Sequence, residues 1–311
     1  MTFTPQHLNL HLTLCLLVLF TLTVTAQEST QDSTVYKQFH KFPLLTLDHF
    51  NYPKTSFNTD TDRGEMEINE QRLTMQIAFP LKEKKTYLFN SINYTLFNYH
   101  TTFDQSALDI QESYHSIQLS IGLISVLPKR WRLVFNAMPT IASDFHRRLN
   151  SDDFIFQVSA MATKRASQNF QYGFGLAYTS RFGNLTIIPL VSLTYKKEKW
   201  LTSVILPAYA SQYYVFNDKY RLGFKAAVYG NLYNVHFDDI ISALDLNRLS
   251  YSRITLGPEF QFKLIGDLYV NTGGGIAVRN VFQVQDDDLN TELDLDVKSR
   301  AYLNVGLRIL K

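Results

Sequence analysis

The sequence predicts an all-β protein: a single antiparallel, up-and-down transmembrane β-barrel of about fourteen strands, with about twelve as the alternative. Three observations support this prediction. Many segments of roughly ten residues alternate apolar and polar side chains, short and long connections alternate between these segments, and the strand count is even. Because successive side chains of a strand point to opposite faces, each such segment has one apolar and one polar face. The apolar faces are expected to contact lipid and the polar faces to line a lumen.

The clearest segment runs from Arg253 to Leu264. Every second residue from Ile254 onward is apolar, whereas the residues between them are polar, charged or glycine. The same alternation recurs at residues 72–79, 116–123, 172–179, 221–228 and 301–310. No segment after the first 26 residues shows a competing helical period.

The connections fall into two classes, as expected for a barrel with short periplasmic turns and longer outer loops. Short turns are predicted at residues 81–85, 127–130, 163–169, 196–199, 217–218 and 265–267. Longer polar connections are predicted at residues 53–69, 100–112, 144–152, 231–249 and 285–297. The two classes alternate if residues 181–184 and 207–208 are tight outer turns and residues 44–52 form the first strand.

Five prolines lie in or at the ends of predicted strands, although a closed barrel has no edge on which proline is easily tolerated. They are Pro80, Pro139, Pro189, Pro207 and Pro258. We expect them at bulges or strand ends near the membrane rims. The final residue, Lys311, is not the aromatic residue that commonly closes such barrels.

Residues 1–26 are predicted to be a secretory signal peptide. The stretch 10–24 is mostly apolar, and Val24-Thr25-Ala26 resembles a small-residue cleavage site before Gln27. A membrane anchor is the alternative, but the stretch falls short of the roughly twenty apolar residues that a spanning helix needs. Cys15, the single cysteine, lies inside it, so the mature chain has no disulfide. The predicted organisation is signal peptide 1–26, short periplasmic leader 27–43 and outer-membrane barrel 44–311.

The composition supports a barrel and gives no argument for a nucleic-acid partner. The 311 residues carry a formal net charge of +2, whereas nucleic-acid binding favours a strongly basic surface. Aromatic residues make up 14% of the chain, which suits strands and membrane-interface belts. A soluble secreted β-sandwich or lectin-like domain is the competing fold, but the recurrent charged face argues against it.

Several stretches resemble an uncharacterised family of outer-membrane β-barrels found in Bacteroidota-type bacteria. They are the run Trp200-Leu-Thr-Ser-Val-Ile-Leu-Pro207, the Tyr-rich strand up to Phe216, Leu222-Gly223, Tyr229-Gly-Asn-Leu-Tyr233, Thr-Ala-Gln27 and Gly-Leu-Arg308. The family has no established chemistry. The resemblance therefore implies a fold and a location in the outer membrane, and it assigns no functional residues.

Two local motifs have a structural and a functional interpretation. Gly273-Gly274-Gly275 lacks the spacing of a phosphate-binding loop, so it is expected to curve a strand or to allow a close approach. Six carboxylates between residues 286 and 296 form an acidic loop, which is expected to be a solvated outer loop. They are Asp286, Asp287, Asp288, Glu292, Asp294 and Asp296. The alternatives are a site for a hard cation such as Ca²⁺, or a cation bridge to lipopolysaccharide.

No catalytic, cofactor-binding or metal-binding residues are predicted, and the protein is not expected to be an enzyme. Three histidines lie near the predicted outer rim with acidic residues close in sequence, but the chain has no established catalytic motif. These residues are His100, His146 and His236, with Asp104, Asp144 and Asp238. A lipid-modifying outer-membrane enzyme is retained as the third functional hypothesis.

Charged residues on the predicted inward face are the strongest functional signal. They are Arg72, Arg221, Lys225, Arg253, Glu259, Lys263 and Arg308. They form either a salt-bridge network that fills the interior or a cation-lined path for small, including anionic, solutes. Whether outer loops or the 27–43 leader plug the lumen is left open.

The predicted function is a passive pore or narrow transporter for small polar or amphipathic solutes, without a cofactor. The alternative is a closed structural or surface-binding barrel whose outer loops engage envelope components. The expected location is the outer membrane of a Gram-negative cell. The expected partners are outer-membrane lipid and lipopolysaccharide, with the barrel-assembly machinery during biogenesis and no nucleic acid.

Overall fold

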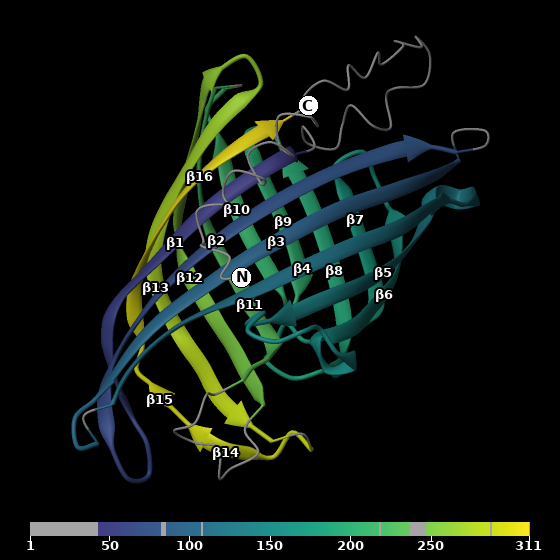
Figure 1. The fold of residues 1–311 in the computed structure, drawn as a ribbon. Coiled ribbons are helices and arrows are strands. Elements are labelled where there is room, and N and C mark those ends of the chain that lie inside the picture. The colour runs from purple at the N-terminus through teal and green to yellow at the C-terminus, as the bar shows by residue number, and fades with distance from the viewer. Residues whose placement is uncertain are drawn as a thin grey trace. The chain divides into compact units, whose positions relative to one another are not determined.

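The computed structural model describes residues 43–310 except 82–84, 107, 218, 237–246 and 287. Within these residues, strands β1 to β13 and β16 close into a fourteen-stranded antiparallel barrel, which confirms the predicted fold class (Figure 1). The strands are β1 (Pro43–Asn58), β2 (Arg63–Pro80), β3 (Thr86–Phe103), β4 (Asp109–Val126), β5 (Trp131–Ser143), β6 (Phe154–Arg165), β7 (Phe170–Thr179), β8 (Thr186–Lys197), β9 (Trp200–Leu206), β10 (Tyr209–Val215), β11 (Tyr220–Asn234), β12 (Arg248–Ile265), β13 (Leu268–Gln285) and β16 (Arg300–Leu310). The predicted signal peptide and leader lie outside the described residues, apart from Pro43.

Each barrel strand pairs with its neighbours in sequence, and β16 closes the ring between β13 and β1. Two short strands, β14 (Thr291–Asp294) and β15 (Asp296–Val297), extend β13 and β1 at one end. As predicted, short turns lie at the end where β1 begins and β16 ends. At the other end, which we call the outer end, β5 ends and β6 begins, β11 ends and β12 begins, and β13 ends and β16 begins.

The predicted long connection at residues 53–69 is wrong. Strand β1 continues to Asn58 and β2 begins at Arg63, so only residues 59–62 connect them. The β1–β2 register shifts between Tyr52 and Thr55. A bulge of this kind moves the alternation by one residue, which is why the two-residue pattern breaks in the sequence although the strand continues.

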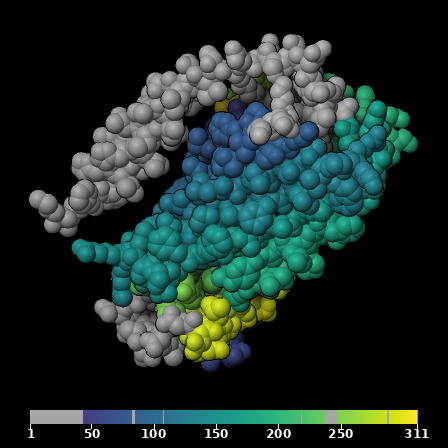
Figure 2. Space-filling model, turned by 90° about the vertical axis from the view of Figure 1, so that its right-hand side faces the viewer, coloured from purple at the N-terminus to yellow at the C-terminus, as the bar shows by residue number. Residues whose placement is uncertain are grey.

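The outer surface of the barrel carries an apolar belt. Side chains that point outward from the strands are large, apolar and exposed, among them Phe156, Phe174, Leu176, Ile187 and Leu303. Such a belt on a closed barrel is the surface that contacts lipid. The described residues contain no helix that is long and apolar enough to cross a membrane. Figure 2 shows one side of the barrel, with β14 and β15 in yellow at its outer end.

The pattern inverts near the outer end, where the prediction of a polar lumen is wrong. Strands β2, β3, β4, β12 and β13 each have 18 residues, more than the 9–11 that cross a bilayer. In the outer part of β2, Glu65 and Gln71 point outward and are exposed, whereas Met66 and Ile68 point inward and are buried. Beyond the bilayer, the outside is in water and the inside must be filled like a protein core.

An aromatic-rich core fills this outer part of the lumen. It consists of buried side chains from strands on both sides of the barrel: Phe50, Tyr52, Phe57, Met66, Ile68, Phe97, Tyr99, Tyr114, Ala142, Ile155, Leu232, Tyr233, Val235, Leu249, Tyr251, Ala277, Phe282, Val284, Leu295, Val297 and Tyr302. The ring centroids of Phe97 and Tyr251 are 4.3 Å apart, and those of Tyr114 and Tyr233 are 5.5 Å apart. We call this cluster the aromatic core.

The barrel also narrows at its outer end because β5 and β11 touch across it. Ser143 and Asn234 form a parallel backbone pair, and the Asp144 amide donates to the Asn234 carbonyl at 3.3 Å. Strands β6 to β10 have 12, 10, 12, 7 and 7 residues and are therefore shorter than β5, with 13 residues, and β11, with 15. The longer strands pass beyond them and close on each other. We call this contact the β5–β11 seam.

The five prolines lie where a ladder is interrupted or a strand ends. The β12–β13 pairing skips Pro258, and the β4–β5 pairing skips Pro139. Pro189 lies beyond the last residue of β8 that pairs with β9. Pro80 ends β2, and Pro207 lies in the β9–β10 turn after a cis peptide bond. At none of these positions does the pairing between strands need the backbone N–H that proline lacks.

Candidate functional site

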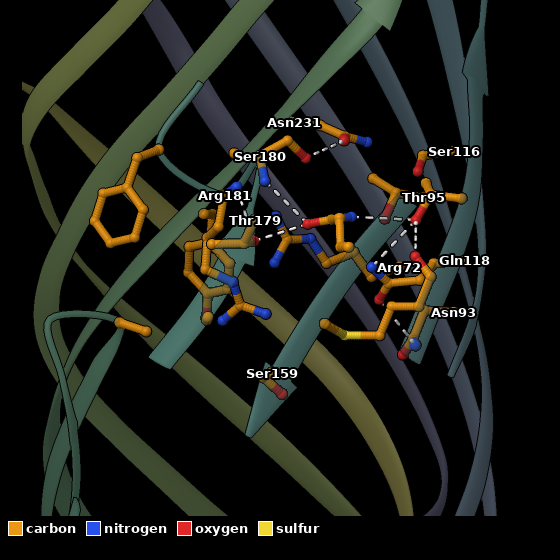
Figure 3. A pocket seen from close by; sticks show the side chains of 18 of the residues that line it. Arg72, Asn93, Thr95, Ser116, Gln118, Ser159, Thr179, Ser180, Arg181 and Asn231 are labelled. Atoms are coloured by element: carbon orange, nitrogen blue, oxygen red, sulfur yellow. Dashed lines mark hydrogen bonds between the residues drawn. The ribbon is translucent and has the colours of Figure 1, made fainter. Parts of the chain in front are cut away.

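A cavity of about 440 Å³ lies inside the barrel, next to the aromatic core. Its lining comes from β2 to β9, β11 and β12 and from the β7–β8 and β9–β10 turns (Figure 3). Tyr233 and Tyr251 belong to both the cavity wall and the aromatic core. The cavity therefore begins where the filled outer part of the lumen ends.

One part of the wall is a continuous chain of hydrogen-bonded polar side chains. The chain runs from β3 to β11 through Asn93, Gln118, Thr140, Gln157, Thr179, Ser180 and Asn231, with donor–acceptor distances of 2.7 to 3.4 Å. Gln157 is its centre: its amide donates to Thr140, and its carbonyl oxygen accepts from Thr179 Oγ1 and from the Ser180 amide. Buried polar groups that are satisfied in this way rigidify the wall.

This chain holds the β7–β8 turn inside the lumen. Ser180 Oγ lies 3.3 Å from Asn231 Oδ1 on β11. A Cβ on Gly230 would lie 2.3 Å from the Arg181 carbonyl oxygen, so the turn packs against β11 at a distance that only glycine permits. The tight turn predicted at residues 181–184 is confirmed. It leans inward and places Arg181 in the cavity (Figure 3).

The cavity carries more positive than negative charge. Its lining contains one carboxylate, Glu70, and two guanidinium groups, Arg72 and Arg181. Glu70 already forms ion pairs with Arg72 and with Arg253 behind it. Arg72 also stacks over Tyr229, with its guanidinium carbon 4.0 Å from the ring centroid. Among the described residues, no carboxylate lies within ion-pair distance of Arg181.

One part of the wall, on β8, β9 and the turn after β9, is apolar. Ile188, Leu190, Ile205 and Ala208 line it. The β8–β9 ladder starts at Val191, so the residues of β8 on the outer side of Val191 have no strand partner in β9. The outer residues of β8 keep their ladder with β7. The cavity lining thus combines polar, cationic and apolar side chains, with an apolar group on β8, β9 and the turn after β9.

A second charged cluster lies on the inner surface away from the cavity. Glu259 lies 3.4 Å from Lys225 and 3.6 Å from Arg308, and it accepts a hydrogen bond from Tyr213. Asp48 lies 3.9 Å from Arg308. These side chains point inward as the alternation predicts. Most of the predicted inward charges are thus paired, as in the salt-bridge interpretation.

Sequence reasoning missed Arg181 and Glu70. Arg181 lies in a turn, where no alternation indicates a direction. Glu70 continues the inward row of Arg72 and could have been found by extending the pattern of β2 by two residues. Of the other predicted inward cations, Arg221 stacks over Tyr213, with its guanidinium carbon 4.9 Å from the ring centroid. Lys263 does not line the cavity, and it forms no ion pair among the described residues.

The histidines predicted near the outer rim lie outside this cavity. Asp144 is 3.1 Å from His236 Nδ1 and 3.8 Å from His146 Nδ1, at the β5–β11 seam. His100 contacts Asp109 at 2.6 Å instead of Asp104, which pairs with Arg63. Asp238 lies outside the described residues.

The two local motifs have structural roles in the described chain. A Cβ on Gly275 would lie 2.0 Å from the Leu256 carbonyl oxygen, which confirms a close approach between β12 and β13. In the acidic loop, Asp286 accepts hydrogen bonds from Asn290. No group of three or more acidic, histidine or cysteine side chains in the described part of the chain is arranged to hold a metal ion. Asp287 lies outside that part.

The comparisons with known proteins point to uncharacterised relatives and to barrels. Residues 36–310 match the family described as "Domain of unknown function (DUF6268)", so the resemblance to an uncharacterised family is confirmed and the Bacteroidota-type origin stays a prediction. No curated protein is significantly similar.

Solved structures similar to this chain include an outer membrane channel from Pseudomonas putida F1. The two sequences are 9% identical, the match covers 88% of this chain and 98% of that chain, and the TM-score is 0.45. The Pseudomonas putida toluene transporter TodX has 8% identity, 85% and 88% coverage and a TM-score of 0.40. The NanC porin has 9% identity, 86% and 100% coverage and a TM-score of 0.38.

Proposed function

The chain belongs to the family described as a domain of unknown function (DUF6268), and on that premise we propose that it is a narrow outer-membrane transporter or pore for small polar or amphipathic solutes. One observation carries this proposal: a cavity of about 440 Å³ lies in the lumen and combines hydrogen-bonding, cationic and apolar walls. Pockets of roughly 300–1,000 Å³ hold small molecules. The proposed activity includes no chemical step.

The proposed passage is narrow because side chains fill much of the lumen. Phe97, Tyr114 and Tyr233 in the aromatic core are fully buried, so the outer part holds no wide channel between them. The β7–β8 turn occupies the space beside the core. Solute transfer then requires small displacements of this turn or of the outer connections, in contrast to free diffusion through a wide porin.

The proposed location is the outer membrane, after export by the predicted signal peptide. A closed barrel satisfies its backbone hydrogen bonds in lipid, and the apolar belt supplies the lipid-facing surface. Lipid and lipopolysaccharide are then the surrounding partners, and the barrel-assembly machinery the partner during insertion. In this orientation, the short turns face the periplasm.

The test is the conductance of the folded chain, purified from outer membranes and placed in a planar bilayer, together with solute uptake by proteoliposomes. We expect small discrete conductance steps and uptake of small solutes but not of large oligosaccharides. Migration that changes on heating verifies that the barrel is folded. A folded barrel that shows neither conductance nor uptake of any small solute would overturn the proposal.

The second candidate is a closed structural or surface-binding barrel, favoured by the buried aromatic core and the β5–β11 seam. These features stabilise the outer end independently of any solute. A folded but silent barrel that copurifies with an envelope component through its outer connections would support this candidate instead.

A further inference from the structure

The arginine on the inward turn is the feature that the proposed function leaves unexplained. Arg181 is exposed to the cavity, and no carboxylate among the described residues pairs with it. A guanidinium presents five N–H donors in a planar fork that matches a carboxylate or phosphate. In this cavity, those donors are available to a ligand.

The position of Arg181 is built by several elements. Gln157 on β6 holds the preceding residue through the Ser180 amide, and Asn231 on β11 lies against the Ser180 hydroxyl. Gly230 permits the contact with the Arg181 carbonyl oxygen. Strands β6 and β11 thus hold the Arg181 cation in a space that already contains Arg72. Two guanidinium groups that share one cavity repel each other, and an anion between them removes that repulsion.

Glu70 does not neutralise this pair. Its carboxylate is shared by Arg72 and the fully buried Arg253, so one negative charge faces two cations before Arg181 is counted. The surplus charge near the cavity is therefore positive. Charge-assisted hydrogen bonds from such groups to an anion are the strong ones in proteins.

The apolar wall restricts the ligand further. Ile188, Leu190 and Ile205 line the cavity that Arg181 enters, and they cannot satisfy a polar group. A purely polar anion would leave this wall in contact with water. A ligand with an anionic head and a short hydrocarbon tail uses both parts, because tail burial contributes about 0.8 kcal/mol for each methylene removed from water.

We infer that this cavity binds an anionic amphiphile, with its carboxylate or phosphate head on Arg181 and Arg72 and its tail against the wall formed by Ile188, Leu190 and Ile205. The inference rests on the proposed function, because it names the class of solute that the lumen accepts. A free short-chain acid and the head of an anionic lipid share this chemistry.

The test is calorimetric titration of the folded full chain in nanodiscs of zwitterionic lipid, with hexanoate, hexanol and acetate as probes. Hexanoate should bind more tightly than hexanol, which lacks the charge, and more tightly than acetate, which lacks the tail. Arg181→Gln should weaken hexanoate binding by about tenfold or more, as expected on losing a charged hydrogen-bonding partner. Arg279→Gln is the matched control, because Arg279 is an exposed arginine on β13 outside the cavity.

Two further variants test the cationic half and the apolar half of the site separately. They also distinguish a loss of binding from a folding defect. Arg181→Lys keeps the charge but loses the planar fork, so it should retain part of the affinity. Ile188→Thr should weaken hexanoate binding and leave acetate binding unchanged. Each variant must keep the heat-modifiable migration of the native barrel.

The lipid source is tested by native mass spectrometry after reconstitution with an anionic phospholipid. Retention of this lipid by the native chain and its loss in Arg181→Gln would support the site with a lipid as occupant. The inference is overturned if neither hexanoate affinity nor lipid retention differs between the native chain and Arg181→Gln.

Failure of this site is distinguishable from failure of the proposed transport. Uptake of a neutral sugar by proteoliposomes with no charge-dependent hexanoate binding would overturn the anionic site and leave the transporter standing. Hexanoate binding that depends on Arg181, with no uptake of any solute, would support the site and overturn the transporter.

Discussion

Asn234 at the end of β11 donates a hydrogen bond of 3.0 Å to Asp153 in the η3 turn (Ser151–Asp153), although 81 residues separate them. Both side chains are buried. The contact ties the β5–β6 connection to the opposite strand and forms part of the β5–β11 seam. This seam narrows the outer end of the fourteen-stranded barrel.

Asn234→Ala should destabilise the barrel by about 1–3 kcal/mol, because it leaves a buried carboxylate oxygen without its donor. The measurement is the urea dependence of the heat-modifiable form. Asn58→Ala is the control, since Asn58 is exposed at the end of β1. Equal stability of the two variants would show that the hydrogen bond between Asn234 and Asp153 does not stabilise the barrel.

The seam should weaken in acid through Asp153. Burial alone would raise the pKa of this carboxyl, but hydrogen bonds from Ser143, Asn150 and Asn234 and the charge of His236 outweigh burial and lower the pKa below its ordinary value. A depressed pKa contributes stability that is present above the unfolded value, about 3.9, and is lost as the pH falls through the folded value. The unfolding temperature should therefore decline below about pH 4, and less so in Asp153→Asn. Parallel pH profiles of the two proteins would contradict this assignment.

Phe97→Ala should both destabilise the barrel and widen its lumen. Phe97 is fully buried in the aromatic core, so its truncation should cost about 3–5 kcal/mol. If the core closes the outer part of the lumen, single-channel conductance should also increase. Phe174→Ala removes a ring from the lipid-facing side and should leave the conductance unchanged. Unchanged conductance in Phe97→Ala would place the constriction elsewhere.

Glu259→Gln should lower stability by about 3–5 kcal/mol, because it removes the carboxylate of a buried ion-pair cluster. Lys225 and Arg308 would lose their shared partner. The lumen should become more anion-selective, which reversal potentials in a salt gradient measure. Glu65→Gln on the exposed outer face is the control. A more cation-selective variant would contradict a solute path past this cluster.

Gln157→Leu should release the β7–β8 turn, because the Ser180 amide and the Thr179 hydroxyl lose their common acceptor. The expected cost is about 1–3 kcal/mol. Backbone amide exchange at residues 179–183 should become faster. Gln71→Leu changes an exposed glutamine on the outside and should leave this exchange unchanged. If the turn stays protected without Gln157, other contacts hold it.

The barrel could be predicted from the chain because its main cause is local. Ile254 to Leu264 on one face and Arg253 to Lys263 on the other follow directly from the two-residue period of a strand. The same period correctly directs Arg72, Lys225, Glu259 and Arg308 inward. It failed at the β1 bulge after Tyr52, where one shifted residue broke the pattern although the strand continues.

Alternation and turn spacing are properties of neighbouring residues, so the amino-acid sequence was enough to predict the fold class, the even number of strands and the direction of most charged side chains. Tertiary structure decided what fills the lumen. Met66 and Ile68 form a core because their strands run beyond the lipid, and Ser143 meets Asn234 because the strands between them are short. Arg181 enters the cavity because Gln157 and Asn231, far away in sequence, hold its turn inward. Such contacts depend on which strands face each other across the closed barrel. The alternation of neighbouring residues along one strand contains no information about which residues of other strands lie across the lumen.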